Sequence, residues 1–229
     1  MLDLLQARMA TLYRTDAHGR IVATNEWDAR PAPRMHLMST PWGPILGVRD
    51  DASDALAARL LDAVHNAQVE TWALGSPRAE DACLAALTAE APVSAIWRGP
   101  AFSLLGEPAA RGEAEAIDAS NVELLRPCFP DWIADVPHRR PFLAVVRGGR
   151  AVSLCASVRI SAQVHCAGVE THADWRGRGF ARAAVAAWAA AVRAAGAVPF
   201  YSTSGDNKAS QAVAKAVGFE TVAVDFHAT

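Results

Sequence analysis

In the second half of the chain, apolar stretches with a strand pattern alternate with apolar stretches with a helix pattern. A β-rich pair of runs around Gly148-Gly149 predicts a hairpin. Glycine 196 and glycine 218 stand where two helices are expected to end. The elements predicted in this half are a helix at 122–128, the hairpin at 141–160, a strand at 163–172, a helix to about 195, a strand at 198–204, a helix at 209–217 and a strand at 219–227.

The first half shows a shorter and less regular set of elements. Its predicted strands are 9–15 and 20–25 around a turn at 16–19, then 31–40 and 43–50, and one or two strands within 91–106 broken at Gly99-Pro100; its predicted helices are 51–67 and 78–91. The polar, alanine- and glycine-rich stretch 107–116 is the expected linker. The chain is therefore predicted to hold an N-terminal α+β domain, 1–110, and a second domain, 113–229.

Composition and charge exclude several classes of protein. The 229 residues carry 22 Lys+Arg against 24 Asp+Glu, which argues against a dedicated nucleic-acid-binding protein. The four widely spaced cysteines form no metal-binding pattern, so no metal is expected. The N-terminus lacks the apolar core of a signal peptide, and no apolar run is long enough to span a membrane. We expect a cytoplasmic protein with no membrane partner.

The stretch Arg176-Gly177-Arg178-Gly179 lies between a predicted strand and a predicted helix. The first turn of a helix has backbone N–H groups without helical partners and carries a partial positive charge. Glycines let an anion approach this backbone closely, and the arginines add charge-assisted hydrogen bonds. The stretch is thus compatible with a pyrophosphate-binding loop. For an isolated motif of this kind, a simple turn with solvated arginines is the better explanation.

Two motifs and the order of the elements resemble the GNAT superfamily of N-acetyltransferases. The family signature, Gln or Arg followed by x-x-G-x and then Gly or Ala, is matched by Arg176, Gly179 and Ala181. A second signature, an Asn followed by a short helix ending in Gly-Phe, is matched by Asn207 and Gly218-Phe219. The resemblance covers about residues 113–226.

The resemblance implies a mixed, splayed β-sheet flanked by helices and an acetyl-CoA-dependent N-acetyltransferase. Backbone N–H groups of the loop would hold the CoA pyrophosphate, and the end of the preceding strand would pair with the pantetheine arm. Asn207 would contact the pantetheine or support the splay, although a helix N-cap is its ordinary role. The implied CoA-binding residues are Val169, Glu170, Thr171, Arg176, Gly177, Arg178, Gly179, Phe180, Ala181, Asn207 and Ser210.

The residues for the chemistry are less evident from the sequence. Many family members have a tyrosine acid seven residues after the Asn, where this chain has Ala214. Ser202, Ser204 and Ser210 are candidate hydroxyl donors, although an ordinary turn or cap role explains each of them singly better. Glu170 is the first candidate for the base and His165 the second; their odd spacing puts them on opposite faces of a regular strand. Proton transfer through ordered water is the alternative.

The acceptor and the role of residues 1–110 are open at this stage. The acceptor would be an amine of a small molecule or a protein. Residues 1–110 could shape the acceptor side, form a degenerate acetyltransferase-like domain, or serve dimerisation or ligand sensing, so a homodimer is one alternative. Without the tyrosine, the second domain could also be a non-catalytic CoA-binding module, and nucleic-acid binding through the arginines is a weaker alternative.

Overall fold

The computed structural model describes residues 1–67, 75–109 and 112–229, which form two compact units. The first unit contains residues 1–101, 203–206 and 221–229, and the second contains 102–202 and 207–220. The predicted division into domains at 1–110 and 113–229 stays a prediction. The contacts nevertheless join the last nine residues of the chain to the first hundred.

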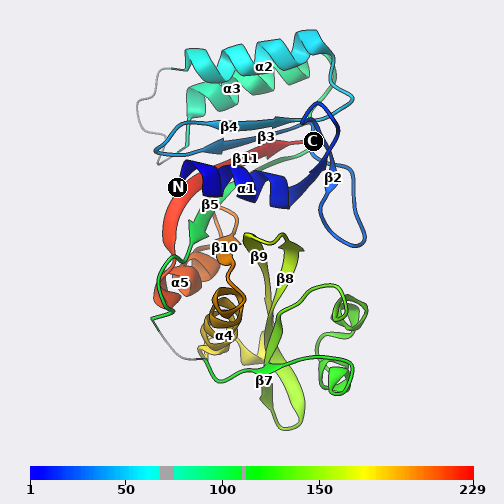
Figure 1. Cartoon of the computed structure of the whole chain (residues 1–229), viewed down its shortest axis with the longest axis vertical. Helices are drawn as coiled ribbons and strands as arrows, with labels where there is room; N and C mark the ends of the chain where they lie inside the picture. The colour runs from blue at the N-terminus through cyan, green and yellow to red at the C-terminus, as the bar shows by residue number, and fades with distance from the viewer. Residues whose placement is uncertain (68–74, 110–111) are drawn as a thin grey trace. The chain divides into compact units, whose positions relative to one another are not determined.

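The first unit is built on strands covered by two helices. Its strands run in the order β4 (Ile45–Val48), β3 (Met35–Ser39), β11 (Glu220–Ala228) and β5 (Ile96–Ser103). Helices α2 (Asp54–Asn66) and α3 (Pro77–Thr88) lie side by side on one face of β3 and β4 (Figure 1). Met35 and Leu37 point to this helical layer, in keeping with the two-residue period of a strand.

The N-terminus is a helix, α1 (Leu2–Leu12), and the strand predicted at 9–15 is wrong over most of its length. Leu5, Met9 and Leu12 recur at helical spacing and are buried together with Arg8. Only the end of the predicted run is extended, as β1 (Tyr13–Thr15), which pairs with β2 (Ile21–Thr24) in the predicted hairpin.

The second unit contains a mixed sheet, as predicted. The strand order is β10 (Val198–Ser202), β9 (Val164–Thr171), β8 (Arg150–Ile160), β7 (Phe142–Arg147) and β6 (Glu115–Ala116). Strands β9 and β10 are parallel, and the other pairs are antiparallel. The hairpin predicted around Gly148-Gly149 is the β7–β8 turn, where both glycines have positive φ.

Helical layers cover both faces of this second sheet. Helices α4 (Phe180–Ala194) and α5 (Lys208–Val217) bury one face, where Leu143, Val145 and Trp188 share a core. The other face of β7 supplies Phe142 and Ala144 to a core with the 3₁₀ helices η1 (Val122–Leu125) and η2 (Pro130–Asp135). The α-helix predicted at 122–128 is therefore wrong in type; prolines 127 and 130 lack the N–H that a longer helix needs.

Two further predictions about chain breaks are corrected. Strand β5 runs without interruption through Gly99-Pro100. A Cβ at Gly99 would lie 2.0 Å from the carbonyl oxygen of Thr203, so glycine is needed for close packing there. The expected linker 107–116 is partly structured: Ala109 N–H donates to Val217 O over 2.8 Å, and β6 lies within it, whereas residues 110–111 lie outside the described residues.

No helix in the described part of the chain combines the length and the apolar character needed to cross a bilayer.

Candidate functional site

Strands β9 and β10 separate after three residue pairs, which creates a fork in the sheet. Their parallel ladder runs from Val164–Val198 to Cys166–Phe200. Beyond Cys166, strand β9 continues to Thr171 and stays paired with β8 on its other side. The structure describes every residue of both strands, and none of Ala167–Thr171 pairs with β10. Backbone groups on this edge of β9 are therefore free of the β10 ladder and can pair with an extended ligand.

The glycine loop after β9 has the backbone geometry of an anion-binding helix start. Gly177 and Gly179 have φ values of 73° and 79°, in the left-handed region that glycine adopts without strain. The first helical hydrogen bond of α4 runs from Ala183 N–H to Gly179 O, so the amides of Phe180–Arg182 have no intrahelical partner. A Cβ on either glycine would meet nothing within 4 Å, so the space beside the backbone is open.

The fork and the loop open into one pocket with a volume of ≈ 610 Å³. Residues from β9, the loop, β10 and α5 converge there. Its lining consists of Val169, Glu170, Thr171, Trp175, Arg176, Gly177, Gly179, Phe180, Ala181, Arg182, Tyr201, Asn207, Ala209, Ser210 and Val213. The structure thus brings together the predicted CoA-binding residues except Arg178, whose guanidinium stacks over the Trp175 ring at 4.9 Å.

Hydrogen bonds around the loop show which groups of Arg176 and Asn207 are already used within the protein. The Arg176 amide donates to Ala173 O over 3.3 Å, and its side-chain Nε donates to Thr171 O over 3.2 Å. Arg176 therefore braces the end of β9 against the loop, while the amides available for an anion begin after it. The Asn207 side chain accepts from Ser210 N–H over 3.0 Å and caps α5, as expected for an N-cap.

Glu170, the first candidate base, lies on the pocket wall and has a fixed orientation. Its Oε2 accepts a hydrogen bond from Trp132 Nε1 over 2.7 Å. Trp132 is itself held by an edge contact with Phe142 and by Arg139, whose guanidinium lies 5.0 Å from the ring centre. The Glu170 residue is exposed to solvent.

His165 and Ser204 do not belong to the described lining of this pocket. The His165 ring is buried, and its Nδ1 lies 2.8 Å from the Ser157 hydroxyl, which in turn accepts from Trp188 Nε1 over 2.9 Å. Burial lowers the pKa of His165 below its usual value. Ser204 Oγ donates to Asp206 over 2.5 Å. The catalytic role predicted for each of them stays a prediction.

Tyr201 is a pocket residue that the sequence did not single out. Its ring is 4 % exposed and its hydroxyl lies 2.7 Å from Ser210 Oγ. Burial raises the pKa of Tyr201 to about 12, against a smaller opposing effect of the Ser210 hydrogen bond. Trp175, Arg182, Ala209 and Val213 also line the pocket without having been predicted as ligand contacts. Strand and helix periodicity alone cannot show which side chains meet across a fork.

The residues present fit the chemical groups of CoA. Open glycine backbone at a helix start, with Arg176 and Arg182 beside it, suits a pyrophosphate. The unpaired edge of β9 suits the amides of the pantetheine arm. Within the ranges 1–67, 75–109 and 112–229, no group of three or more His, Cys, Asp or Glu side chains is arranged to hold a metal ion.

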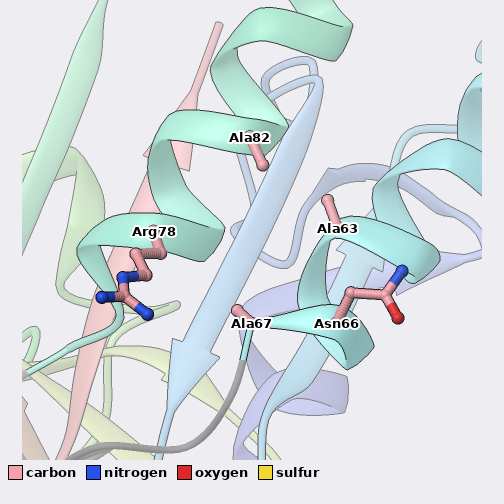
Figure 2. A pocket seen from close by; sticks show the side chains of 5 residues that line it. All are labelled: Ala63, Asn66, Ala67, Arg78 and Ala82. Carbon is pink, nitrogen blue, oxygen red and sulfur yellow. The ribbon is translucent and has the colours of Figure 1, made fainter.

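A second hollow, of ≈ 370 Å³, lies between α2 and α3 and offers less chemistry. Its described lining is Ala63, Asn66, Ala67, Arg78 and Ala82. Figure 2 shows the Arg78 and Asn66 side chains pointing away from one another, so they do not converge on a common ligand group. The first pocket is therefore the candidate site.

Comparisons with known proteins point to one family. The family model described as GNAT acetyltransferase matches residues 143–224, which include the fork, the glycine loop and α5. The search among curated proteins gave no match.

Among solved structures, several matches have the same fold at low sequence identity. A GNAT-family protein from Novosphingobium aromaticivorans is 18% identical, with a TM-score of 0.52 over 60% of this chain and 65% of that one. A GNAT-family acetyltransferase from Colwellia psychrerythraea is 12% identical, with a TM-score of 0.51 over 81% and 76% of the two chains. A GCN5-related N-acetyltransferase-like protein from Streptococcus suis is 16% identical, with a TM-score of 0.51 over 100% of both chains. At these identities the likeness concerns the fold.

Proposed function

We propose that this chain, whose residues 143–224 match the GNAT acetyltransferase family model, binds acetyl-CoA in the ≈ 610 Å³ pocket and transfers the acetyl group directly to an amine. The acceptor is an amine of a small molecule or of a protein. The observation that carries the proposal is the joining, in one pocket, of the unpaired β9 edge, the glycine loop and the Asn207-capped helix.

In this proposal the pyrophosphate binds the α4 helix start. Amides from Gly177 onward donate to its oxygens, and the positive end of the helix stabilises its charge. Arg182, in the first turn of the helix, adds a charge-assisted contact from the pocket wall. The pantetheine arm then extends along Val169–Thr171 as an added strand.

Glu170 is proposed to receive the proton that the acceptor amine loses. An amine must be neutral to attack a thioester, and a carboxylate on the pocket wall can accept that proton directly or through water. Trp132 acts as a positioning residue, since its indole N–H holds one carboxylate oxygen. The other carboxylate oxygen, Oε1, is then the one proposed to face the acceptor.

Titration calorimetry with acetyl-CoA, followed by a thiol-release assay, tests this function. The assay should include small diamines, amino sugars and peptides with free N-termini or lysines as acceptors. Binding together with acceptor-dependent CoA release supports an N-acetyltransferase. Binding without release on any amine favours a non-catalytic CoA-binding module, which the absence of a tyrosine at Ala214 suggests as the alternative. No acetyl-CoA binding contradicts both.

A further inference from the structure

The strongest feature not used so far is the hydroxyl pair of Tyr201 and Ser210. We propose that these two side chains form a relay that donates a proton to the sulfur of CoA, with Ser210 touching the sulfur and Tyr201 supplying Ser210. This inference rests on the proposed function, since it assigns the acid for the same transfer reaction.

The position of Tyr201 places the pair at the apex of the fork. The last paired residue of β10 is Phe200, opposite Cys166, so Tyr201 is the first residue of β10 beyond the ladder. Ser210 lies in the first turn of α5 and lines the same pocket as the free edge of β9. The pocket is lined by Val169–Thr171 of this edge and by both hydroxyl-bearing residues, so a group that follows the edge away from the loop approaches the two hydroxyls.

The length of the pantetheine arm matches this path. From Thr171, next to the loop, back to Ala167, next to the fork, is four residues of β9, or about 13 Å at the rise of a strand. The arm from pyrophosphate to sulfur contains about thirteen bonds, and an extended chain with about 3.5 Å per three bonds reaches about 15 Å. A pyrophosphate at the α4 helix start therefore brings the sulfur to the apex.

Both hydroxyls are held in place by their surroundings. The Tyr201 ring packs at 6.5 Å from the Phe102 ring and 5.9 Å from the Phe219 ring, centre to centre. Ser210 is fixed through its backbone, because its N–H donates to the Asn207 side chain. Ala214, one turn further along α5, is buried and has no polar side-chain atom to offer. The pair is the pocket's source of hydroxyl protons near the apex.

The transfer step balances with this relay. The amine nitrogen attacks the thioester carbonyl carbon, and the C–S bond of the tetrahedral intermediate breaks with its electron pair on sulfur. Ser210 gives its proton to that sulfur and takes one from Tyr201. The tyrosinate regains a proton from solvent, and the proton lost by nitrogen leaves through Glu170, so the products are the amide and CoA thiol.

Burial keeps Tyr201 protonated before each turnover, and it makes the tyrosinate short-lived because burial disfavours its charge. Its raised pKa, about 12, keeps the phenol neutral at physiological pH. Ser210 Oγ, 2.7 Å away, accepts from the phenol and can point its own hydrogen toward the pocket. Two hydrogen bonds in series polarise one another, which strengthens the terminal donor.

The test measures the titration of bound CoA thiol and needs no acceptor. Free CoA is incubated with excess protein, alkylated with iodoacetamide at a series of pH values, and the alkylated CoA is quantified by chromatography. A hydrogen bond to the thiolate should lower the midpoint of this reaction in the wild type. Ser210→Ala should raise it by about one pH unit, the scale of a hydrogen bond to a charged group.

The relay also predicts how the variants combine. Tyr201→Phe should raise the midpoint less, because Ser210 still donates, and Tyr201→Phe with Ser210→Ala should equal Ser210→Ala alone. Ser210→Thr keeps the hydroxyl and should restore the wild-type midpoint. Tyr13→Phe removes the other tyrosine hydroxyl of the chain, bonded to His36 in the first unit, and should leave it unchanged.

The outcomes separate the relay from the proposed function. CoA binding with the same midpoint in all variants, or independent additive shifts from Tyr201 and Ser210, would overturn the relay alone. Absence of CoA binding by the wild-type protein, measured by calorimetry beforehand, would overturn the proposed function and the relay with it.

Discussion

At the scale of single residues, the candidate site depends on backbone conformation more than on side-chain charge. Gly179 stands at the N-cap of α4 in a left-handed conformation, with open space where a side chain would be. A side chain at that point would be strained and would also project toward the place proposed for the pyrophosphate. The glycine thus serves both the turn and the approach of the ligand.

Gly179→Glu should therefore abolish acetyl-CoA binding, with a loss of affinity of about 100-fold or more. The carboxylate fills the proposed cradle and opposes the pyrophosphate charge at close range. Gly196→Glu is the matched control, because Gly196 ends the same helix with φ 83° and equally open surroundings. Calorimetry should show wild-type affinity for that variant, and equal losses in both variants would count against the loop as the binding site.

The sequence motifs selected the loop residues and Asn207 as site candidates, because a glycine turn and a helix N-cap depend on local backbone. The sequence did not predict Tyr201 as a site residue. Its partner, Ser210, lies on a different element, and the two side chains meet only when β10 and α5 pack together. The sequence also could not predict the hydrogen bond from the Arg176 amide to Ala173 O. This bond depends on a 3₁₀ turn at Ala173–Trp175 that no sequence pattern indicated.

At the scale of elements, α1 shows how a local pattern was misleading. Its end, Thr11-Leu12, runs into Tyr13 of β1 as a stretch typical of a strand, and the arginine at position 8 breaks the apolar face. In the structure Arg8 is buried because Asp225 of β11 pairs with it, through bonds of 2.8 and 2.5 Å. A carboxylate 217 residues away thus decides where this part of α1 lies.

Arg8→Ala should destabilise the protein by about 3–5 kcal/mol, because it leaves a buried carboxylate without its cation. Urea denaturation followed by circular dichroism measures the free energy of unfolding. Arg126→Ala, which breaks an exposed pair with Glu123, should change it by less than about 1 kcal/mol. Replacing both buried partners, Arg8→Met with Asp225→Leu, should recover much of the loss; failure of that recovery would point to a role of Arg8 other than the ion pair.

At the scale of the whole molecule, the first unit is completed only by the end of the chain. Strand β11 pairs with β3 from Val224–Ser39 to Ala228–Met35, and Phe226 joins the core beneath α2 and α3. The alternation in 219–227 predicted a strand but not its neighbours, since pairing partners are set by tertiary packing. The boundary near residue 110 was predicted from the composition of the linker. Composition does not show that residues 221–229 come back to pack with the first unit.

This arrangement makes the first unit sensitive to acid. Asp225 faces Arg8 and His36, whose Nε2 lies 3.3 Å from its Oδ1. Burial alone would raise the pKa of Asp225, but the Arg8 charge, the adjacent His36 ring and the two hydrogen bonds from Arg8 outweigh it and hold the pKa well below its usual range. The folded pKa is below the unfolded one, so the stabilisation is complete above about pH 5 and is lost as the pH falls below about 4.

Unfolding free energies from urea titrations at pH 7, 5, 4 and 3 should therefore decrease steeply at the acid end in the wild type. Asp225→Asn should be less stable at pH 7 and should show a flatter decrease between about pH 5 and 3, because its side chain no longer takes up a proton on unfolding. Asp3→Asn, at an exposed position of α1, should keep the wild-type profile. An unchanged acid profile in Asp225→Asn would mean that other carboxylates set the acid stability, and that the Arg8–Asp225 pair joins the ends of the chain without controlling their response to pH.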